Sequence, residues 1–180
     1  MSTELALTWL DNFVPPKDAS EALERSLEYA EFEENWCTGR LFEVRDGTQY
    51  DPVTSEYVLG EGREVCTNVR ACAMGIIVIA CLDGPAVKKF FDSRYDFEEE
   101  QVLTRNTVAK QATKFLARAL NTGFPKSGEG SGFADAIGAV EQTNDNGVRK
   151  LGRKIHHQNI VRGFRDALAM AREDAAKHAD

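Results

Sequence analysis

Few side chains in this chain of 180 residues have the types that most enzymes use for chemistry. Its histidines are His156, His157 and His178, so general acid–base catalysis has few candidates. The sequence has no Walker A loop, no dinucleotide-binding glycine fingerprint, no paired-histidine zinc motif, no CxxC and no nucleophile elbow. The sequence therefore argues against the common classes of nucleotide-dependent and metal-dependent enzymes. We predict no cofactor and no metal site.

Three short polar features remain, and they are far apart along the chain. They are the Trp36-Cys37-Thr38-Gly39 segment, the Cys72-Ala73-Met74-Gly75 segment and the Asn144-Asp145 pair. If the fold brought them together with the adjacent histidines, Asp145 or a histidine would be the base and Asn144 would orient a substrate. A small hydrolase or transferase is thus kept as an alternative. Its candidate ligand-binding residues are Trp36, Cys72, Gly75, Asn144, Asp145, His156 and His157.

Each of these residues also has a purely structural interpretation, which we favour. Trp36 is typical of an aromatic residue at the edge of a core. A glycine inside a helix indicates close packing, so Gly75 predicts a helix–helix crossing, with an approaching ligand as the alternative. Asn144 and Asp145 suit a turn before a helical segment, because their side chains can satisfy free backbone amides. Burial would make Cys72 unreactive, and we predict no catalytic residue.

A basic stretch runs from residue 148 to residue 165 and contains no acidic residue. The formal net charge of the whole chain is -7, which argues against a general nucleic-acid coat but leaves room for a local patch. A nucleic-acid or nucleotide binder is the second alternative. Its patch would consist of Arg149, Lys150, Arg153, Lys154, Arg162 and Arg165.

The elements that must position these residues are mostly helices. Hydrophobic residues make up 42% of the chain, enough for a real core. Apolar periodicity predicts helices beginning near Asp18 and over 68–82, 106–121, 133–142 and 159–177, with a dense turn signal over 143–147. Strand-type residues and turn signals over 40–59 predict a small β-hairpin.

The predicted fold class is therefore mainly α (α+β), a single domain over residues 1–180 with about five or six helices. Residues 1–16 form an N-terminal extension, and residues 123–132 form a flexible loop. The longest apolar stretch, 71–82, is shorter than the ~20 residues that a membrane span needs. With no secretory signal pattern at the N-terminus, we expect a cytoplasmic protein whose four cysteines are buried and reduced.

The order of these motifs resembles a family of small proteins from actinobacteria and their phages, a domain of unknown function (DUF6197-like). The resemblance rests on Trp36 near the end of the first capped helix, on the Cys72–Gly75 helix segment and on the Asn144-Asp145 turn before the last helix. It covers roughly residues 18–175. Thr143 stands where the family usually has Trp, and Ile76-Ile77 replaces Ala-Leu. The resemblance implies a phage or actinobacterial cytoplasmic accessory protein and implies no reaction.

Together these observations favour a non-enzymatic binding or interaction protein. The resemblance implies that it is phage-encoded and acts on a host or virion partner. A chain of this size can hold a helical core and present one face to a protein partner or to a second copy of itself. We expect no membrane partner. The predicted partner contacts are the aromatic residues Trp9, Phe13, Phe90 and Phe91.

Overall fold

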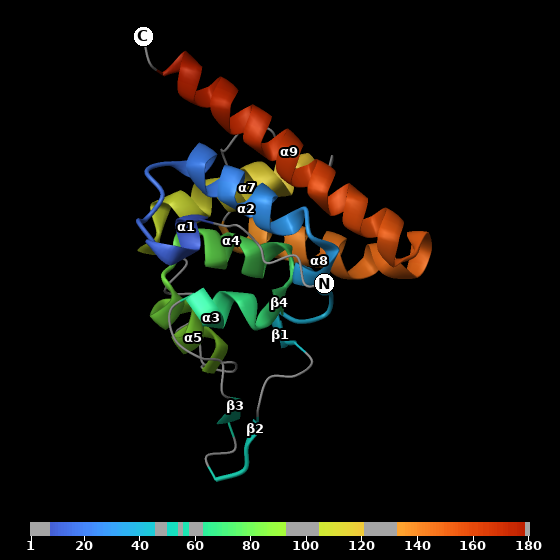
Figure 1. Ribbon diagram of the computed structural model, residues 1–180. Coiled ribbons are helices and arrows are strands. Elements are labelled where there is room, and N and C mark those ends of the chain that lie inside the picture. Colours follow the sequence, from blue (N-terminus) through green and yellow to red (C-terminus); the bar gives the residue numbers. More distant parts are fainter. Residues whose placement is uncertain are drawn as a thin grey trace.

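The computed structural model describes residues 8–45, 50–53, 56–57, 63–92, 105–120 and 133–178 (Figure 1). Its helices are α1 (Thr8–Asp11), α2 (Ala19–Ala30), the 3₁₀ helix η1 (Glu33–Asn35), α3 (Arg63–Thr67), α4 (Ala73–Cys81), α5 (Gly84–Asp92), α7 (Thr107–Leu120), α8 (Phe133–Leu151) and α9 (Arg153–Lys177). Its strands are β1 (Phe42–Val44), β2 (Tyr50–Asp51), β3 (Glu56–Tyr57) and β4 (Val69–Ala71). The predicted mainly α fold class is confirmed. There are more helices in this part of the chain than predicted, partly because short elements such as α3 and η1 give no clear periodic signal.

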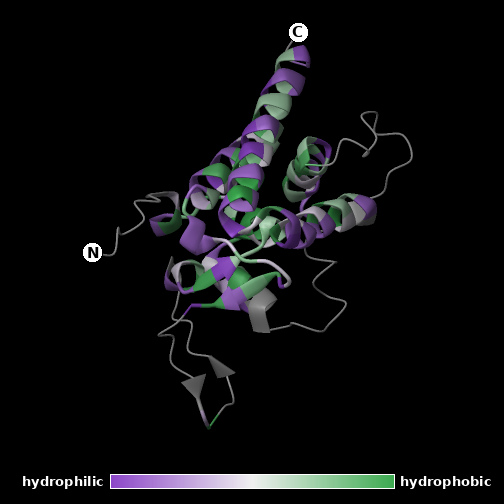
Figure 2. Cartoon of the chain, turned by 90° about the vertical axis from the view of Figure 1, so that its right-hand side faces the viewer, coloured by the Kyte–Doolittle hydropathy of each residue, from purple (hydrophilic) through white to green (hydrophobic). Residues whose placement is uncertain are grey.

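Helix α4 lies at the centre of the core. All nine of its residues are buried, as its uniformly apolar sequence predicts. Helices α2, α7 and α8 pack against it, and α9 crosses over α2, α7 and α8 (Figure 1). The last buried residue of α9 is Ala171, and beyond it the C-terminal turns extend past the other helices (Figure 2).

Side-chain caps fix where several helices begin. The Asp18 carboxylate accepts a hydrogen bond from the Glu21 amide (2.9 Å), so the predicted start of α2 is confirmed. Asn106 accepts one from the Ala109 amide (3.0 Å) at the start of α7. Asp83 accepts one from the Ala86 amide (2.9 Å) at the start of α5. These caps satisfy amides that the first turn of a helix leaves without an intrahelical partner.

The strands form two antiparallel pairs and not one hairpin. Strands β2 and β3 pair with each other within the predicted hairpin region. Strand β1 pairs instead with β4, which places Phe42 opposite Ala71. The helix predicted over 68–82 is therefore wrong in its first turn. Residues 69–71 are extended because they hydrogen-bond to β1, and the helix begins only after Cys72.

The turn predicted over 143–147 is also wrong. Helix α8 continues through this segment to Leu151, and α9 begins at Arg153, six residues before the predicted start. The break between the two helices is at Gly152, whose φ of 77° suits a residue without a side chain. The predicted loop 123–132 lies outside the described residues. None of the described helices is long and apolar enough to span a membrane.

Candidate functional site

The polar features that the sequence separates meet around the side chain of Asn144, which is fully buried in α8. Its Oδ1 accepts hydrogen bonds from Trp36 Nε1 (2.8 Å) and from the Ala73 backbone N–H (3.2 Å). Its Nδ2 donates to the Cys37 carbonyl oxygen (3.2 Å) and to Asp145 Oδ1 (3.0 Å). The amide of Asn144 thus has two acceptor and two donor contacts, which is its full hydrogen-bonding capacity.

The neighbouring Asp145 extends the same connection to the loop before β1. Its Oδ1 accepts a hydrogen bond from the Gly39 amide (2.7 Å). Gly39 has φ 77°, a left-handed conformation that favours glycine. The sequence-based idea that Asn144 and Asp145 satisfy free backbone amides is therefore right. The amides belong to α4 and to the Gly39 loop, however, and not to a local turn.

Trp36 is the aromatic centre of this cluster and is fully buried. The rings of His156 and His157 lie 5.5 Å and 5.4 Å from its ring. The Arg153 guanidinium lies 5.0 Å from the same ring and donates a hydrogen bond to the Trp36 carbonyl oxygen (2.7 Å). A cation over an indole face is a favourable contact. Arg153 therefore holds the start of α9 against Trp36, the residue that follows η1.

Both histidines are held in one orientation by backbone carbonyl groups. His156 Nε2 lies 2.8 Å from the Asn144 carbonyl oxygen, and His157 Nε2 lies 2.7 Å from the Ala30 carbonyl oxygen. Because a carbonyl oxygen only accepts hydrogen bonds, both Nε2 atoms carry the hydrogen. A Cβ on Gly147 would lie 2.0 Å from His156 Cε1, so only glycine at this position lets the ring approach α8.

Gly75 permits a second close approach, next to the cluster. A Cβ at this position would lie 2.4 Å from the Leu41 carbonyl oxygen and 2.9 Å from the Phe42 ring. The prediction that another backbone packs closely on Gly75 is therefore right. The expected helix–helix crossing is wrong, because the backbone that approaches belongs to the loop leading into β1.

The cysteines are buried free thiols. Burial raises the pKa of the Cys66, Cys72 and Cys81 thiols to about 12, and burial with the nearby Cys72 raises the pKa of Cys37 further. Cys72 Sγ accepts the Gly75 amide at the start of α4 (3.5 Å). Thiols with such pKa values hold their protons at neutral pH and are weak nucleophiles.

A cavity of about 670 Å³ lies beside the cluster, between α7, α8 and α9. We name it the α8–α9 cavity. Thr143 and Gly147 of α8, His156 and Gly163 of α9, and Leu120 of α7 contribute to its walls. Its hydrophilic side chains also include Gln142, Asn146, Lys150, Asn159, Arg162 and Asp166. The lining is mostly polar with a smaller apolar part, and the volume lies within the range of ~300–1,000 Å³ that is typical of ligand sites.

A smaller cavity of about 200 Å³ lies at the Gly39 loop and is lined by Cys72, Glu141 and Asp145 among others. Desolvation and the Asp145 carboxylate raise the pKa of Glu141. His156 lines the larger cavity, whereas Cys72 and Asp145 line the smaller one. The predicted pocket residues are therefore close together in the fold but do not face one common cavity.

The basic stretch does not form one continuous patch. Arg153 and Arg165 reach back toward acidic residues, lying 3.4 Å from Glu33 and 3.5 Å from Glu31. Lys150 and Arg162 line the α8–α9 cavity. Arg149 and Lys154 are exposed near the Gly152 break between the helices.

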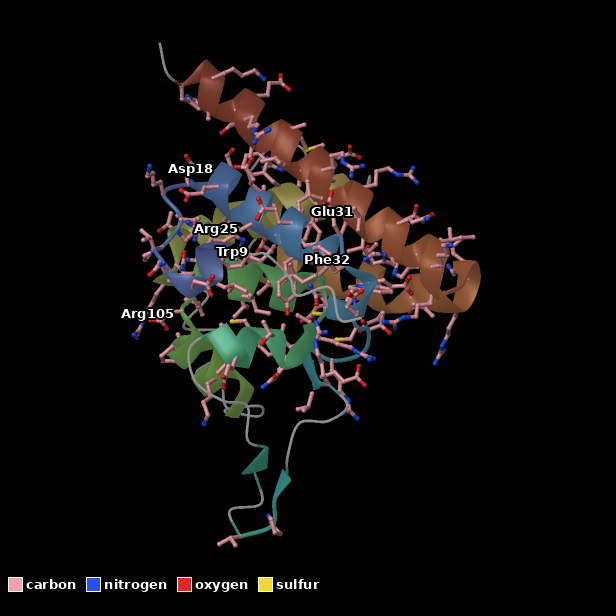
Figure 3. The ribbon with its side chains drawn as sticks, in the orientation of Figure 1. Trp9, Asp18, Arg25, Glu31, Phe32 and Arg105 are labelled. Carbon is pink, nitrogen blue, oxygen red and sulfur yellow. The ribbon has the colours of Figure 1, made fainter. Side chains whose placement is uncertain are left out.

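Two of the four predicted partner contacts pack on the chain itself. Trp9 and Phe13 are half-buried, and the Arg25 guanidinium lies 5.6 Å and 5.8 Å from their rings. Trp9 and Arg25 are labelled in Figure 3. Trp9 Nε1 also donates a hydrogen bond to Glu28 (3.0 Å). Both rings are therefore partly covered by residues of α2. Phe90 and Phe91 belong to α5, but their side chains lie outside the described part.

The described exposed large apolar side chains lie elsewhere. Leu151 (46% exposed) and Ile155 (54%) flank the break between α8 and α9. Others are Val14, Val53 and Met170. Across the described ranges, no group of three or more His, Cys, Asp or Glu side chains is placed to hold a metal ion.

Sequence reasoning missed the roles of Arg153 and Gly147. The sequence places Arg153 in the basic patch and Gly147 in the turn over 143–147. A glycine within a strongly amphipathic segment is a signal of close packing, and it could have identified the contact with His156. Nothing in the sequence could have identified Trp36 as the partner of Arg153.

Comparison with known proteins adds no relative. No protein-family model, curated protein or solved structure matches this chain.

Proposed function

We propose that this chain is a non-enzymatic helical binding protein whose binding site is the α8–α9 cavity. One contrast carries the proposal. In the buried polar cluster, other groups of the chain occupy all four hydrogen-bonding positions of the Asn144 side chain. The cavity beside the cluster, in contrast, has polar side chains along its walls. A saturated cluster fixes the positions of helices, and a cavity with polar walls can receive another molecule.

The enzyme alternative has less support from the geometry. A base must lie within hydrogen-bonding reach of the proton that it removes, on the side where a substrate can bind. His156 lines one cavity, and Cys72 and Asp145 line the other. The raised pKa of Cys72 also argues against a nucleophilic thiol at neutral pH.

The nucleic-acid alternative also has less support. A surface for a polyanion needs several cations free to contact phosphates. Two of the six predicted basic residues, Arg153 and Arg165, lie beside acidic residues of the chain itself. The remaining four are divided between the cavity and the helix break.

The resemblance to the actinobacterial and phage family fits this proposal. The resemblance rests on residues that lie in one cluster, namely Trp36, Cys72 to Gly75 and Asn144-Asp145. Hydrogen bonds in this cluster link α8 to α4, to the Gly39 loop and to the segment that follows η1. Such a cluster explains a motif spread over distant segments without any reaction. We therefore propose a cytoplasmic accessory protein that binds another molecule in the α8–α9 cavity.

Native mass spectrometry of the protein purified gently from its own source tests the binding site. We expect a mass above the 20.0 kDa of the chain. An Asn146→Trp substitution, at an exposed residue of the cavity wall, should remove the added mass. Gln158→Trp is the matched control, because this exposed residue of α9 does not line the cavity. An added mass that survives Asn146→Trp, or a bare chain from the source, would refute the proposal.

A further inference from the structure

We propose that the α8–α9 cavity binds a small organic anion, with a carboxylate or phosphate group joined to an apolar body. This inference rests on the proposed function and adds the chemical class of the ligand. The cavity lining contains two cationic side chains, Lys150 and Arg162, and one carboxylate, Asp166. The lining thus has one more positive than negative side chain, although the chain as a whole has a net charge of -7.

Arg162 is positioned for such a contact. Its guanidinium donates a hydrogen bond to Asn159 Oδ1 (2.9 Å), one turn closer to the start of α9, and both residues line the cavity. The structure gives no acidic side chain within ion-pair distance of Arg162 among the described residues, in contrast to Arg153 and Arg165. A guanidinium held in this way keeps donors for a planar anionic group.

The apolar part of the cavity lining would contact the apolar body of the ligand. Leu120, Leu151 and Ile160 line it together with Ala119 and Gly163. A Cβ on Gly163 would lie 2.3 Å from Leu120 Cδ2, so the glycine brings α7 and α9 close together at this wall. A second glycine, Gly147, admits the His156 ring in the same way. The walls are thus set by tight packing, and an apolar body can bury its surface there.

The volume of the cavity fits a small molecule. At about 670 Å³ the cavity lies within the range of sites for small molecules, which is ~300–1,000 Å³. A long polyanion would need the further cations that are spread elsewhere on α8 and α9. The hydrogen-bonding side chains Gln142, Asn146 and Asn159 supply neutral contacts for the rest of a small ligand.

The test uses two probes of nearly equal shape, 2-naphthoate and its neutral analogue 2-naphthamide, titrated into ¹⁵N-labelled full-length protein. We expect 2-naphthoate to shift the amide resonances of Gly147 and Gly163 and to bind at least about five times more tightly than the amide. Lys150→Met and Arg162→Met should each weaken the naphthoate by about tenfold. Lys154→Met is the control, since this lysine is exposed on α9 outside the cavity, and should leave binding unchanged.

Equal binding of the two probes, or naphthoate binding that neither cavity substitution weakens, would overturn the anion inference and leave the proposed binding site intact. Shifts confined to residues away from the cavity, or no shifts at millimolar probe, would also overturn it. The proposed function fails separately, when the added mass in native mass spectrometry survives Asn146→Trp.

Discussion

Replacing Asn144 with alanine tests how much of the fold depends on the buried polar cluster. The substitution leaves Trp36 Nε1, the Ala73 amide and the Cys37 carbonyl without their partner. Each buried polar group that loses its hydrogen bond costs about 1–3 kcal/mol. The contact to Asp145 costs little, because that side chain is exposed and can be hydrated. Relaxation makes such costs less than additive, so we expect a loss of about 3–5 kcal/mol in the free energy of unfolding.

The assay is urea unfolding followed by circular dichroism and by tryptophan fluorescence. A loss of this size is a large fraction of the ~5–15 kcal/mol by which domains are usually stable. Asn146→Ala is the matched control, because Asn146 is exposed two residues later in the same helix. It should change the unfolding free energy by no more than about 0.5 kcal/mol. A loss below about 1 kcal/mol for Asn144→Ala would refute the reasoning, because the cluster would then not hold the helices together.

Two further substitutions test neighbouring contacts. Gly147→Ala should lower the free energy of unfolding, measured in urea, by about 1–3 kcal/mol. Alanine favours helices, but its Cβ would lie 2.0 Å from the His156 ring. A gain in stability would contradict this expectation and show that the ring can move away. Glu141→Gln should raise the melting temperature at pH 7 and not below about pH 4. The pKa of Glu141 is raised in the folded protein, so the folded state binds its proton more tightly than the unfolded chain does. Wild-type stability therefore falls as pH rises from the unfolded value of 4.5 through the folded pKa. A melting-temperature difference that is the same at both pH values would contradict this.

The parts of the fold that sequence predicted best are those with local causes. Helix α7 follows from its apolar periodicity and its Asn106 cap, and the start of α2 follows from Asp18. The central position of α4 follows from a run of apolar residues on all sides of the helix. In each case the signal and the structure lie within a few residues of each other.

The errors arose where a distant contact decides the local structure. Thr143 to Gly147 have the composition of a turn, yet they remain helical because Asn144 bonds to Trp36 and Gly147 receives the His156 ring. The residues of the candidate pocket could be named from their types. The α8 residues among them line one cavity or the other according to the face of α8 on which each residue lies. The sequence predicted a turn over 143–147 and not a helix, so it could not predict these faces.

The central claim is that the α8–α9 cavity is where this protein binds another molecule. The most direct test places the photo-crosslinking amino acid benzoylphenylalanine at position 146 or at position 158 and irradiates cells of the protein's own source. Intact-mass analysis then measures the adducts. We predict a defined adduct, either a small molecule or a second protein, at position 146 and none at position 158, because Asn146 lines the cavity and Gln158 does not. Equal adducts at both positions, or an adduct at position 158 alone, would contradict the claim.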